Sequence, residues 1–523
     1  MVGGAVAFAV LATLNAGGYR YGASDQAFYI PAVLHQFDPA LFPRDWAMLG
    51  AQARFFFVDE IFANLVRVSG LPLAAWFALA QFATLAVFYA GALALGRQVL
   101  TSPWAVTAWM AALTLRHRIA KTGANTLEGY FHPRMLVFGL GLLALADVLR
   151  GRRWRPVLVL LASATLHPTT AALFLGLVLV ALVVNDRRLR LPVAGASAVA
   201  ACAGAAALVA GVTPVDLTPM DAVWRALVAT KDYTFPATWS SGTWAMNLAG
   251  PIVLAAIGWV RHRDGTLSHA ERGLLAGCLA LVAGFLLSLP WVSAGVPLAV
   301  QLQTSRAFWP VEIVATLYLV WWLVDRPERA PARLWRGRAV AVVLVAVSVA
   351  RASYVGFIES PDRETLALDL PRDDWTTALR WIREETPPDT YVLADPGHAW
   401  KFGTAVRIGA ARDVFLEETK DVAMAIYSRD AAHRVTGRIA ATQGFADMTA
   451  ATLTTLAARE GLGVFVTERT LDLPVAHRVG VFTVYRFVRD GRARDTVLYS
   501  ILVEEWRDVR RHLESRLARH RAP

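Results

Sequence analysis

Asp25 is the side chain whose position most clearly suggests chemistry. It lies in the stretch Y-R-Y-G-A-S-D-Q-A-F-Y-I-P, residues 19–31, which follows an apolar N-terminal segment. A carboxylate at a membrane–water boundary is partly desolvated, and desolvation raises its affinity for a proton. Such a group can take the proton of a hydroxyl nucleophile, so we expect Asp25 to act as a general base.

A purely structural role for Asp25 is the alternative. The stretch S-D-Q-A-F begins a segment with helical periodicity, and Ser or Asp is the residue expected to cap the first turn of a helix. Because Ser24 can serve as the cap instead, the sequence leaves both interpretations of Asp25 open.

The loop that carries Asp25, residues 18–70, is long and unusually apolar. Loops of this length are usually functional or disordered, and this one is too rich in aromatic residues for disorder. Its segments 26–37 and 52–68 can each form an amphipathic helix that lies along a membrane surface. The loop therefore has the elements needed to hold Asp25 beside a membrane.

Apolar segments follow this loop and also precede it. The chain is 56% hydrophobic and 18% charged, whereas soluble domains carry about 25% charge. About 20 apolar residues cross a hydrocarbon core. We predict about eleven transmembrane helices, near residues 1–17, 71–95, 104–115, 135–149, 156–166, 171–184, 191–212, 247–261, 273–290, 310–324 and 339–357. One proline-kinked helix is the alternative to two over 156–184.

Basic residues in the short loops predict the orientation. The loops 97–103, 150–155, 185–190, 261–272 and 325–338 hold 16 Arg and Lys in 45 positions, and the alternate loops hold 11 in 125. The denser set is expected to face the cytoplasm. The N-terminus is then cytoplasmic, and the loop 18–70 lies outside. Eleven crossings also place the end of the chain outside.

The chain changes character after residue 357. Apolar residues at helical spacing occupy 375–385, short β-like runs occupy 391–394, 463–467 and 479–488, and helical stretches lie between them. Strands that alternate with helices favour a small α/β domain. We therefore predict a polytopic α-helical membrane domain, 1–357, and an extracytoplasmic α/β domain, 358–523.

Composition also argues against several partners. The net charge is +11, but 48 of the 52 basic residues are Arg, and no basic stripe alternates with exposed aromatic residues, so no nucleic-acid partner is expected. Neither Cys nor His residues have metal-ligand spacing. The sequence identifies no cofactor and gives no support for a divalent metal.

The combination of a membrane-entry helix, a large outside loop with an acidic residue, many spans and an outside C-terminal domain resembles the GT-C superfamily. These integral-membrane glycosyltransferases use polyprenyl-phosphate sugars. In several of them the first loop carries an Asp-Glu pair, whereas the matching pair here is Asp25-Gln26. The resemblance is to the architecture of the whole chain, and we expect the nearer relatives among bacterial GT-C-like membrane proteins.

The resemblance implies basic groups that stabilise the departing polyprenyl phosphate. The second outside loop contains E-G-Y-F-H-P-R, residues 128–134, and Arg306 precedes a later span. We assign this role to Arg134, His132, Arg306 and Arg20, although anchoring at the lipid headgroups explains each of them too. Tyr21, His167 and Glu312 are expected to line the same cavity.

The resemblance thus implies an inverting glycosyltransferase in the bacterial cytoplasmic membrane. Its partners would be membrane lipids, a polyprenyl-phosphate-linked sugar as donor, and a glycan, lipid or protein as acceptor. The alternative is a non-catalytic scaffold, or a lipid or polysaccharide transporter of the same architecture. A transporter is expected to show two related halves with interrupted spans, and the sequence shows no such symmetry.

Overall fold

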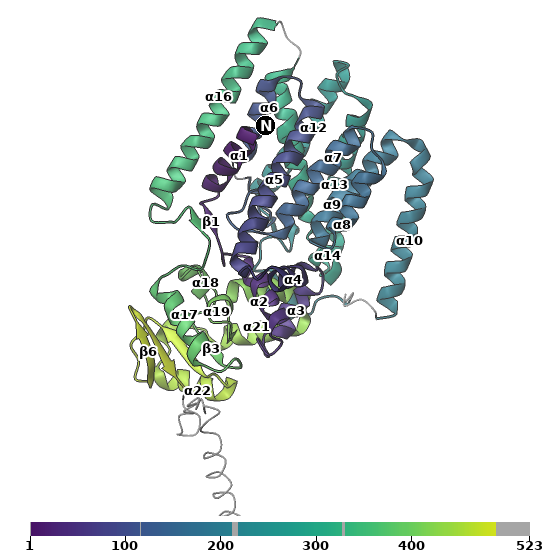
Figure 1. Ribbon diagram of the computed structural model, residues 1–523. Coiled ribbons are helices and arrows are strands. Elements are labelled where there is room, and N and C mark those ends of the chain that lie inside the picture. The colour runs from purple at the N-terminus through teal and green to yellow at the C-terminus, as the bar shows by residue number, and fades with distance from the viewer. Residues whose placement is uncertain (1, 116, 212–217, 327–329, 488–523) are drawn as a thin grey trace, which may run out of the picture.

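The structure, a computed structural model, describes residues 2–115, 117–211, 218–326 and 330–487. It consists of a helical bundle and a smaller part at one end of the bundle that contains the sheet (Figure 1). We call residues 358–487 the tail. The last 36 residues of the predicted α/β domain, 488–523, lie outside the described residues.

The bundle has a helix at each of the positions predicted from the sequence. The predicted run 156–184 is divided into two helices that pack against each other, as the two-helix interpretation requires. The helices are α1 (Val2–Asn15), α5 (Leu73–Val99), α6 (Pro103–Thr114), α7 (Pro133–Leu149), α8 (Trp154–Ser163), α9 (Pro168–Asn185), α10 (Arg190–Val209), α12 (Ser241–Arg263), α13 (His269–Ser293), α15 (Phe308–Val320) and α16 (Ala330–Tyr354).

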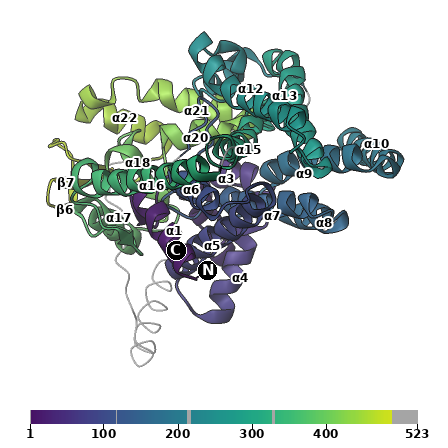
Figure 2. The ribbon, with the colours of Figure 1, turned by 90° about the horizontal axis from the view of Figure 1, so that it is seen from above.

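Seven helical segments of the described chain are long and apolar enough to cross a membrane, so the chain has the helices of a polytopic membrane protein. Others at predicted positions are shorter: α1 has 14 residues, α6 has 12 and α8 has 10. A count of eleven crossings is therefore not confirmed. Figure 2 shows α10 at the edge of the bundle beside α9, and none of its residues is buried.

The centre of the bundle depends on close packing between helices. A Cβ atom added to Gly91 of α5 would lie 2.5 Å from the carbonyl oxygen of Gly139 in α7. Without side chains at these positions, the two backbones approach closely enough to bury Phe88 and Phe138 between them. The α5–α7 pair thus forms a rigid support for the loop that precedes α7.

The first loop contains three helices and lies at the same end of the bundle as the tail (Figure 1). Helix α2 has the predicted bounds. The second predicted helix, 52–68, begins too early, because residues 52 and 53 are the end of α3, residues 54–57 form a turn and α4 begins at Val58. Strand β1 pairs in parallel with β2 from the tail. The elements are β1 (Tyr19–Arg20), α2 (Gln26–Phe37), α3 (Trp46–Ala53), α4 (Val58–Ser69) and β2 (Leu366–Ala367).

The tail contains a five-stranded sheet in the order β4-β3-β5-β7-β6. Strands β3, β4 and β5 are parallel, and β7 runs antiparallel to β5 and to β6. The elements are α17 (Asp374–Glu385), β3 (Tyr391–Leu393), α18 (His398–Lys401), α19 (Val406–Gly409), β4 (Asp413–Val414), α20 (Glu418–Met424), α21 (Arg429–Ala441), α22 (Ala450–Glu460), β5 (Val464–Thr467), β6 (Val475–Val479) and β7 (Phe482–Arg486).

The predicted strands are found with one change. The run 479–488 is not a single strand, because Gly480 has a positive φ of 52° and turns the chain between β6 and β7. Helix α17 covers one face of the sheet through Trp375 and Leu379. The other face shares a core with the first loop, in which Phe42 and Met48 pack with residues of β3 and α21.

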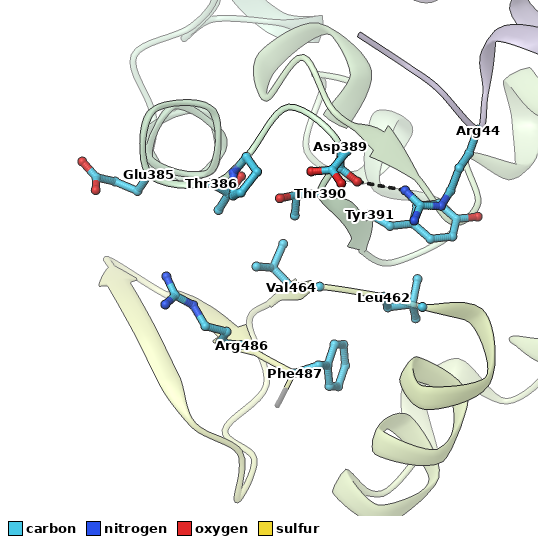
Figure 3. Close-up of a pocket in the computed structure, with 13 residues that line it drawn as sticks. Arg44, Glu385, Thr386, Asp389, Thr390, Tyr391, Leu462, Val464, Arg486 and Phe487 are labelled. Atoms are coloured by element: carbon cyan, nitrogen blue, oxygen red, sulfur yellow. Dashed lines mark hydrogen bonds between the residues drawn. The ribbon is translucent and has the colours of Figure 1, made fainter. Parts of the chain in front are cut away.

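Polar contacts add to this shared core. The guanidinium of Arg44, in the first loop, donates a hydrogen bond of 2.8 Å to the carbonyl oxygen of Asp389 in the tail. Figure 3 shows Arg44 at one side of a pocket in the tail, which Arg486 and Phe487 also line. The first loop and the tail are therefore packed as one unit, and this unit holds the groups described next.

Candidate functional site

Asp25 immediately precedes α2, but its side chain does not cap the helix. No hydrogen bond joins the Asp25 carboxylate to the first turn. The amides of Gln26, Ala27 and Phe28 bond instead to the carbonyl oxygens of Ala23, Ser24 and Asp25. The capping interpretation of Asp25 is therefore wrong, and the carboxylate is available for other partners.

Three basic side chains converge on the Asp25 carboxylate. Lys420 of α20 places Nζ 2.7 Å from Oδ1. His132 Nε2 lies 3.3 Å from Oδ2, and Arg134 Nη2 lies 3.7 Å from the same oxygen. The Asp25 side chain remains 23% exposed. We call these four residues the Asp25 cluster.

His132 is held in one tautomer by the start of α7. Its Nδ1 accepts a hydrogen bond from the Arg134 backbone N–H at 3.2 Å, which makes His132 the cap of α7. The proton of a neutral imidazole must then be on Nε2, which donates toward Asp25. Burial and the charge of Arg134 lower the pKa of His132, so the ring is neutral at neutral pH.

Arg134 is fixed by a second carboxylate. Its Nη2 is hydrogen-bonded to Glu128 Oε1, and its Nη1 donates to the carbonyl oxygen of Gly123 at 3.2 Å. The Glu128 carbonyl oxygen accepts from Gln81 of α5 at 2.9 Å, which attaches this loop to the bundle. Glu128 thus neutralises Arg134 in part and keeps it beside Asp25.

Gln26 explains the departure from an Asp-Glu pair. Its Oε1 accepts a hydrogen bond of 2.6 Å from the Gly22 backbone N–H, and its Nε2 donates one of 3.2 Å to the Phe131 carbonyl oxygen. The side chain is completely buried. A glutamate in this place has no donor for Phe131, so the amide is needed to join the first loop to the segment that carries His132.

The electrostatic balance keeps Asp25 ionised. Burial raises the pKa of the Asp25 carboxyl, but the charge of Lys420, the hydrogen bond from His132 and the charge of Arg134 outweigh burial. The result is a pKa well below the ordinary value. An ionised carboxylate surrounded by cations can bind a hydroxyl group, and the cations can bind an added anion.

His167 and Arg306 lie close to the cluster. The His132 and His167 rings are 5.8 Å apart between centroids. The pKa of His167 is lowered well below its ordinary value, first by burial and also by the charges of Arg306 and Arg134. The Nε of Arg306 is 3.5 Å from the carbonyl oxygen of Thr122 in the loop that also contains Glu128. Two further predicted residues are thus gathered around Asp25.

The other predicted residues have different surroundings. Arg20 lies in β1 and lines a cavity formed with the linker 359–373. Tyr21 packs edge-on against Phe77, with ring centroids 5.7 Å apart. Glu312 of α15 faces α12, because its Oε2 lies 2.5 Å from where a Cβ of Gly250 would be. No contact of Tyr21 or Glu312 with the Asp25 carboxylate is found in the described structure.

Lys420 and Lys231 were not selected from the sequence. Lys231 Nζ donates a hydrogen bond of 2.8 Å to the carbonyl oxygen of Thr419, the neighbour of Lys420. Burial and the charge of Lys420 lower the pKa of Lys231. The available signal was rarity, because the chain has four Lys against 48 Arg and two of the four lie here. Because Lys231 and Lys420 are far apart in the sequence, their proximity was not evident from it.

An apolar groove adjoins the cluster on the side of the bundle. Phe131 and Pro133, which flank His132, line it, and so does Leu166, which precedes His167. Its volume is about 280 Å³. The remaining lining residues come from α4, α5 and α7 and are apolar: Val58, Ile61, Phe62, Leu65, Trp76, Leu79, Ala80, Ala83 and Leu136.

Among the residues that the structure describes, no group of three or more His, Cys, Asp or Glu side chains has the arrangement of a metal site. The cluster therefore presents a single carboxylate with basic partners, next to an apolar groove. Basic side chains near an apolar groove are a combination that can bind an amphiphile with an anionic headgroup.

The sequence matches no family model and no curated protein. Similar solved structures include two of archaeal oligosaccharyltransferases. One is the archaeal oligosaccharyltransferase AglB from Archaeoglobus fulgidus in complex with an inhibitory peptide and a dolichol-phosphate, with a TM-score of 0.38 and 12% identity over 89% of this chain and 69% of that chain. The other is the oligosaccharyltransferase of Archaeoglobus fulgidus in the apo form, with a TM-score of 0.35 and 13% identity over 88% and 69%. A likeness at this level assigns no function.

Proposed function

We propose that this protein is a membrane glycosyltransferase that moves a sugar from a polyprenyl-phosphate donor to a hydroxyl group of a lipid, glycan or protein. The observation that carries the proposal is that the apolar groove is lined by Phe131 and Pro133, the chain neighbours of His132 in the Asp25 cluster. An apolar chain in the groove would have its headgroup near the segment that carries His132, because this segment forms part of the groove wall.

The charges of the cluster support a phosphate headgroup. Arg134, Lys420 and Arg306 are cations, and the carboxylates that face them are Asp25 and Glu128. A phosphate would find charged donors within one small volume, and charge-assisted hydrogen bonds are the strong ones. His132 would add a neutral N–H donor.

The reaction would then be a single displacement with inversion at the sugar. The acceptor oxygen attacks the anomeric carbon, the bond from that carbon to the phosphate oxygen breaks, and the phosphate keeps the electron pair. Asp25 takes the proton of the acceptor hydroxyl. Arg134 and Arg306 stabilise the negative charge that grows on the phosphate.

The membrane side follows from the basic loops. The arginine-rich loops between α7 and α8, between α9 and α10 and between α12 and α13 lie at the end of the bundle remote from the tail (Figure 1). The positive-inside rule assigns that end to the cytoplasm. The cluster and the tail are then extracytoplasmic, with the bacterial cytoplasmic membrane as the expected location.

Transfer of a labelled sugar tests the proposal. The purified protein in nanodiscs is given polyprenyl-phosphate hexose donors and an extract of membrane acceptors. We expect transfer by the wild type and a loss of at least a thousandfold in Asp25→Asn. Asp232→Asn is the matched control, because Asp232 is an exposed outside-loop aspartate paired with a lysine, Lys121. Equal transfer by Asp25→Asn and the wild type contradicts the proposal.

A further inference from the structure

Lys420 differs from the other two partners of Asp25 in how it is held. Arg134 is fixed by Glu128 and Gly123, and His132 is fixed by the backbone of α7. In the described part of the chain, the Lys420 ammonium has one hydrogen bond, to Asp25 Oδ1 at 2.7 Å. It also lies 5.2 Å from the centroid of the Phe28 ring.

The fold of the tail explains why a lysine reaches this point. Lys420 lies on α20, directly after β4, at the carboxyl edge of the parallel strands β3 and β4. Ligands of open α/β sheets bind outside this edge, where the loops after the strands meet. In this protein that edge is turned toward the first loop, so the tail presents its α20 to Asp25 and not to bulk solvent.

We propose that Lys420 is a donor-phosphate ligand supplied by the tail, and that its movement from Asp25 to the phosphate frees Asp25 to act on the acceptor. The inference rests on the proposed function and deepens it, because it assigns a phosphate ligand and couples donor binding to the readiness of the base.

The side chain suits such an exchange. A lysine ammonium is a compact charge with three donors on a flexible stem, whereas an arginine guanidinium grips a carboxylate in a rigid fork. The Lys420 side chain is 10% exposed, so its charge acts in a poorly hydrated space. Lysine is rare in this chain, which has 48 Arg and four Lys, so a Lys at this position is notable and fits a role that an Arg would not fill.

The exchange changes the base strength of Asp25. While Lys420 is bound, the Asp25 carboxylate is a weak base, because the lysine is the largest influence that lowers its pKa against burial. When Lys420 moves to the phosphate, burial is opposed by one charge fewer, so the pKa of Asp25 rises and the carboxylate becomes a better proton acceptor. The acceptor proton then goes to Asp25, the new bond forms at the anomeric carbon, and the departing phosphate keeps its electron pair beside the ammonium.

The experiment compares Lys420→Gln, Lys420→Arg and the control Lys401→Gln in the full-length protein. Lys401 is the matched control because it is a tail lysine paired with a carboxylate, Glu468, at 2.6 Å, and it is exposed. Binding of polyprenyl phosphate, with the uncharged polyprenol as reference, is measured by native mass spectrometry. Transfer rates are measured from pH 4 to pH 9.

We expect Lys420→Gln to bind polyprenyl phosphate at least tenfold more weakly and polyprenol unchanged, with a raised donor KM. The acid limb of the pH–rate profile of Lys420→Gln should move to higher pH, because Asp25 without Lys420 is protonated more easily. Lys420→Arg should keep binding within about threefold but lose turnover at least tenfold, since arginine holds Asp25. Lys401→Gln should match the wild type.

The outcomes separate the two proposals. If the wild type binds polyprenyl phosphate and Lys420→Gln binds it equally, the role of Lys420 is overturned while the proposed function stands. If the wild type binds no polyprenyl phosphate, the proposed function and this inference both fall. Should Lys420→Gln not fold, Lys420→Arg decides, and wild-type turnover in that variant overturns the inference.

Discussion

The guanidinium of Arg407 in the tail donates a hydrogen bond of 2.8 Å to the carboxylate of Asp45 in the first loop, and both side chains are fully buried. Arg407 also binds Asp421 at 2.6 Å, the residue after Lys420. One arginine of α19 thus joins the residue before α3 to α20. This network fixes the distance between the helix that carries Lys420 and the loop that carries Asp25.

Loss of Arg407 should separate the tail from the first loop. Arg407→Met leaves Asp45 and Asp421 buried without their main partner, which typically costs about 3–5 kcal/mol of stability. Thermal unfolding in detergent should show a clearly lower Tm for the tail. Arg429→Met is the control, because the Arg429–Asp221 pair is exposed and exposed ion pairs contribute little to stability. Equal Tm changes in the two variants would contradict this role of Arg407.

Glu417 should make the stability of the tail depend on pH. Burial raises its pKa from the ordinary 4.5 to about 8, although Arg407 Nη1 lies 3.6 Å away. Between these two pH values the folded state holds a proton that the unfolded chain releases. The contribution of Glu417 to stability is therefore full below pH 4.5 and falls as the pH rises toward 8, by on the order of 1 kcal/mol per pH unit.

Glu417→Gln removes the proton that causes this slope. We expect the Tm of the variant to change less between pH 5 and pH 8 than that of the wild type, measured by differential scanning fluorimetry. Glu384→Gln, at an exposed position on α17, serves as the control and should keep the wild-type slope. A wild-type slope in Glu417→Gln would show that another group is responsible.

Filling the apolar groove should weaken donor binding without slowing the chemical step. Ala83 of α5 lines the groove and is exposed, so Ala83→Trp would occupy much of the space available to a lipid chain. We expect donor KM to rise about tenfold or more while kcat changes less than threefold. Ala256→Trp, at an exposed site on α12, should leave both constants unchanged. A rise in KM in both variants would point to a general effect on the bundle.

Local elements could be predicted well from the sequence. Helix α2 begins at Gln26 and ends at Phe37 as the periodicity predicts, because its apolar face and its ends are encoded within twelve residues. His132 and Arg134 were selected because they lie at the outer end of a span, and both contact Asp25. Their catalytic roles stay predictions.

The long-range parts of the site could not be predicted. Lys420 and Asp25 are separated by 395 positions, and their contact exists only because the tail packs on the first loop. Strand β4 has two residues, too short to show a period of two. The cap interpretation of Asp25 also depended on tertiary structure, since Lys420 and His132 compete for its carboxylate. Local rules of helix capping do not take account of partners that come from distant parts of the sequence.

The most direct test of the central claim is to locate the donor on the protein. A polyprenyl phosphate with a photoreactive group in its chain is irradiated with the full-length protein in nanodiscs, and the labelled peptides are sequenced. We expect labels at the apolar groove, in residues 58–83 and 131–136, removed by excess polyprenyl phosphate and reduced at least tenfold in Arg134→Gln. Labelling that is spread over α10 and α16, or that excess polyprenyl phosphate does not remove, would contradict the claim.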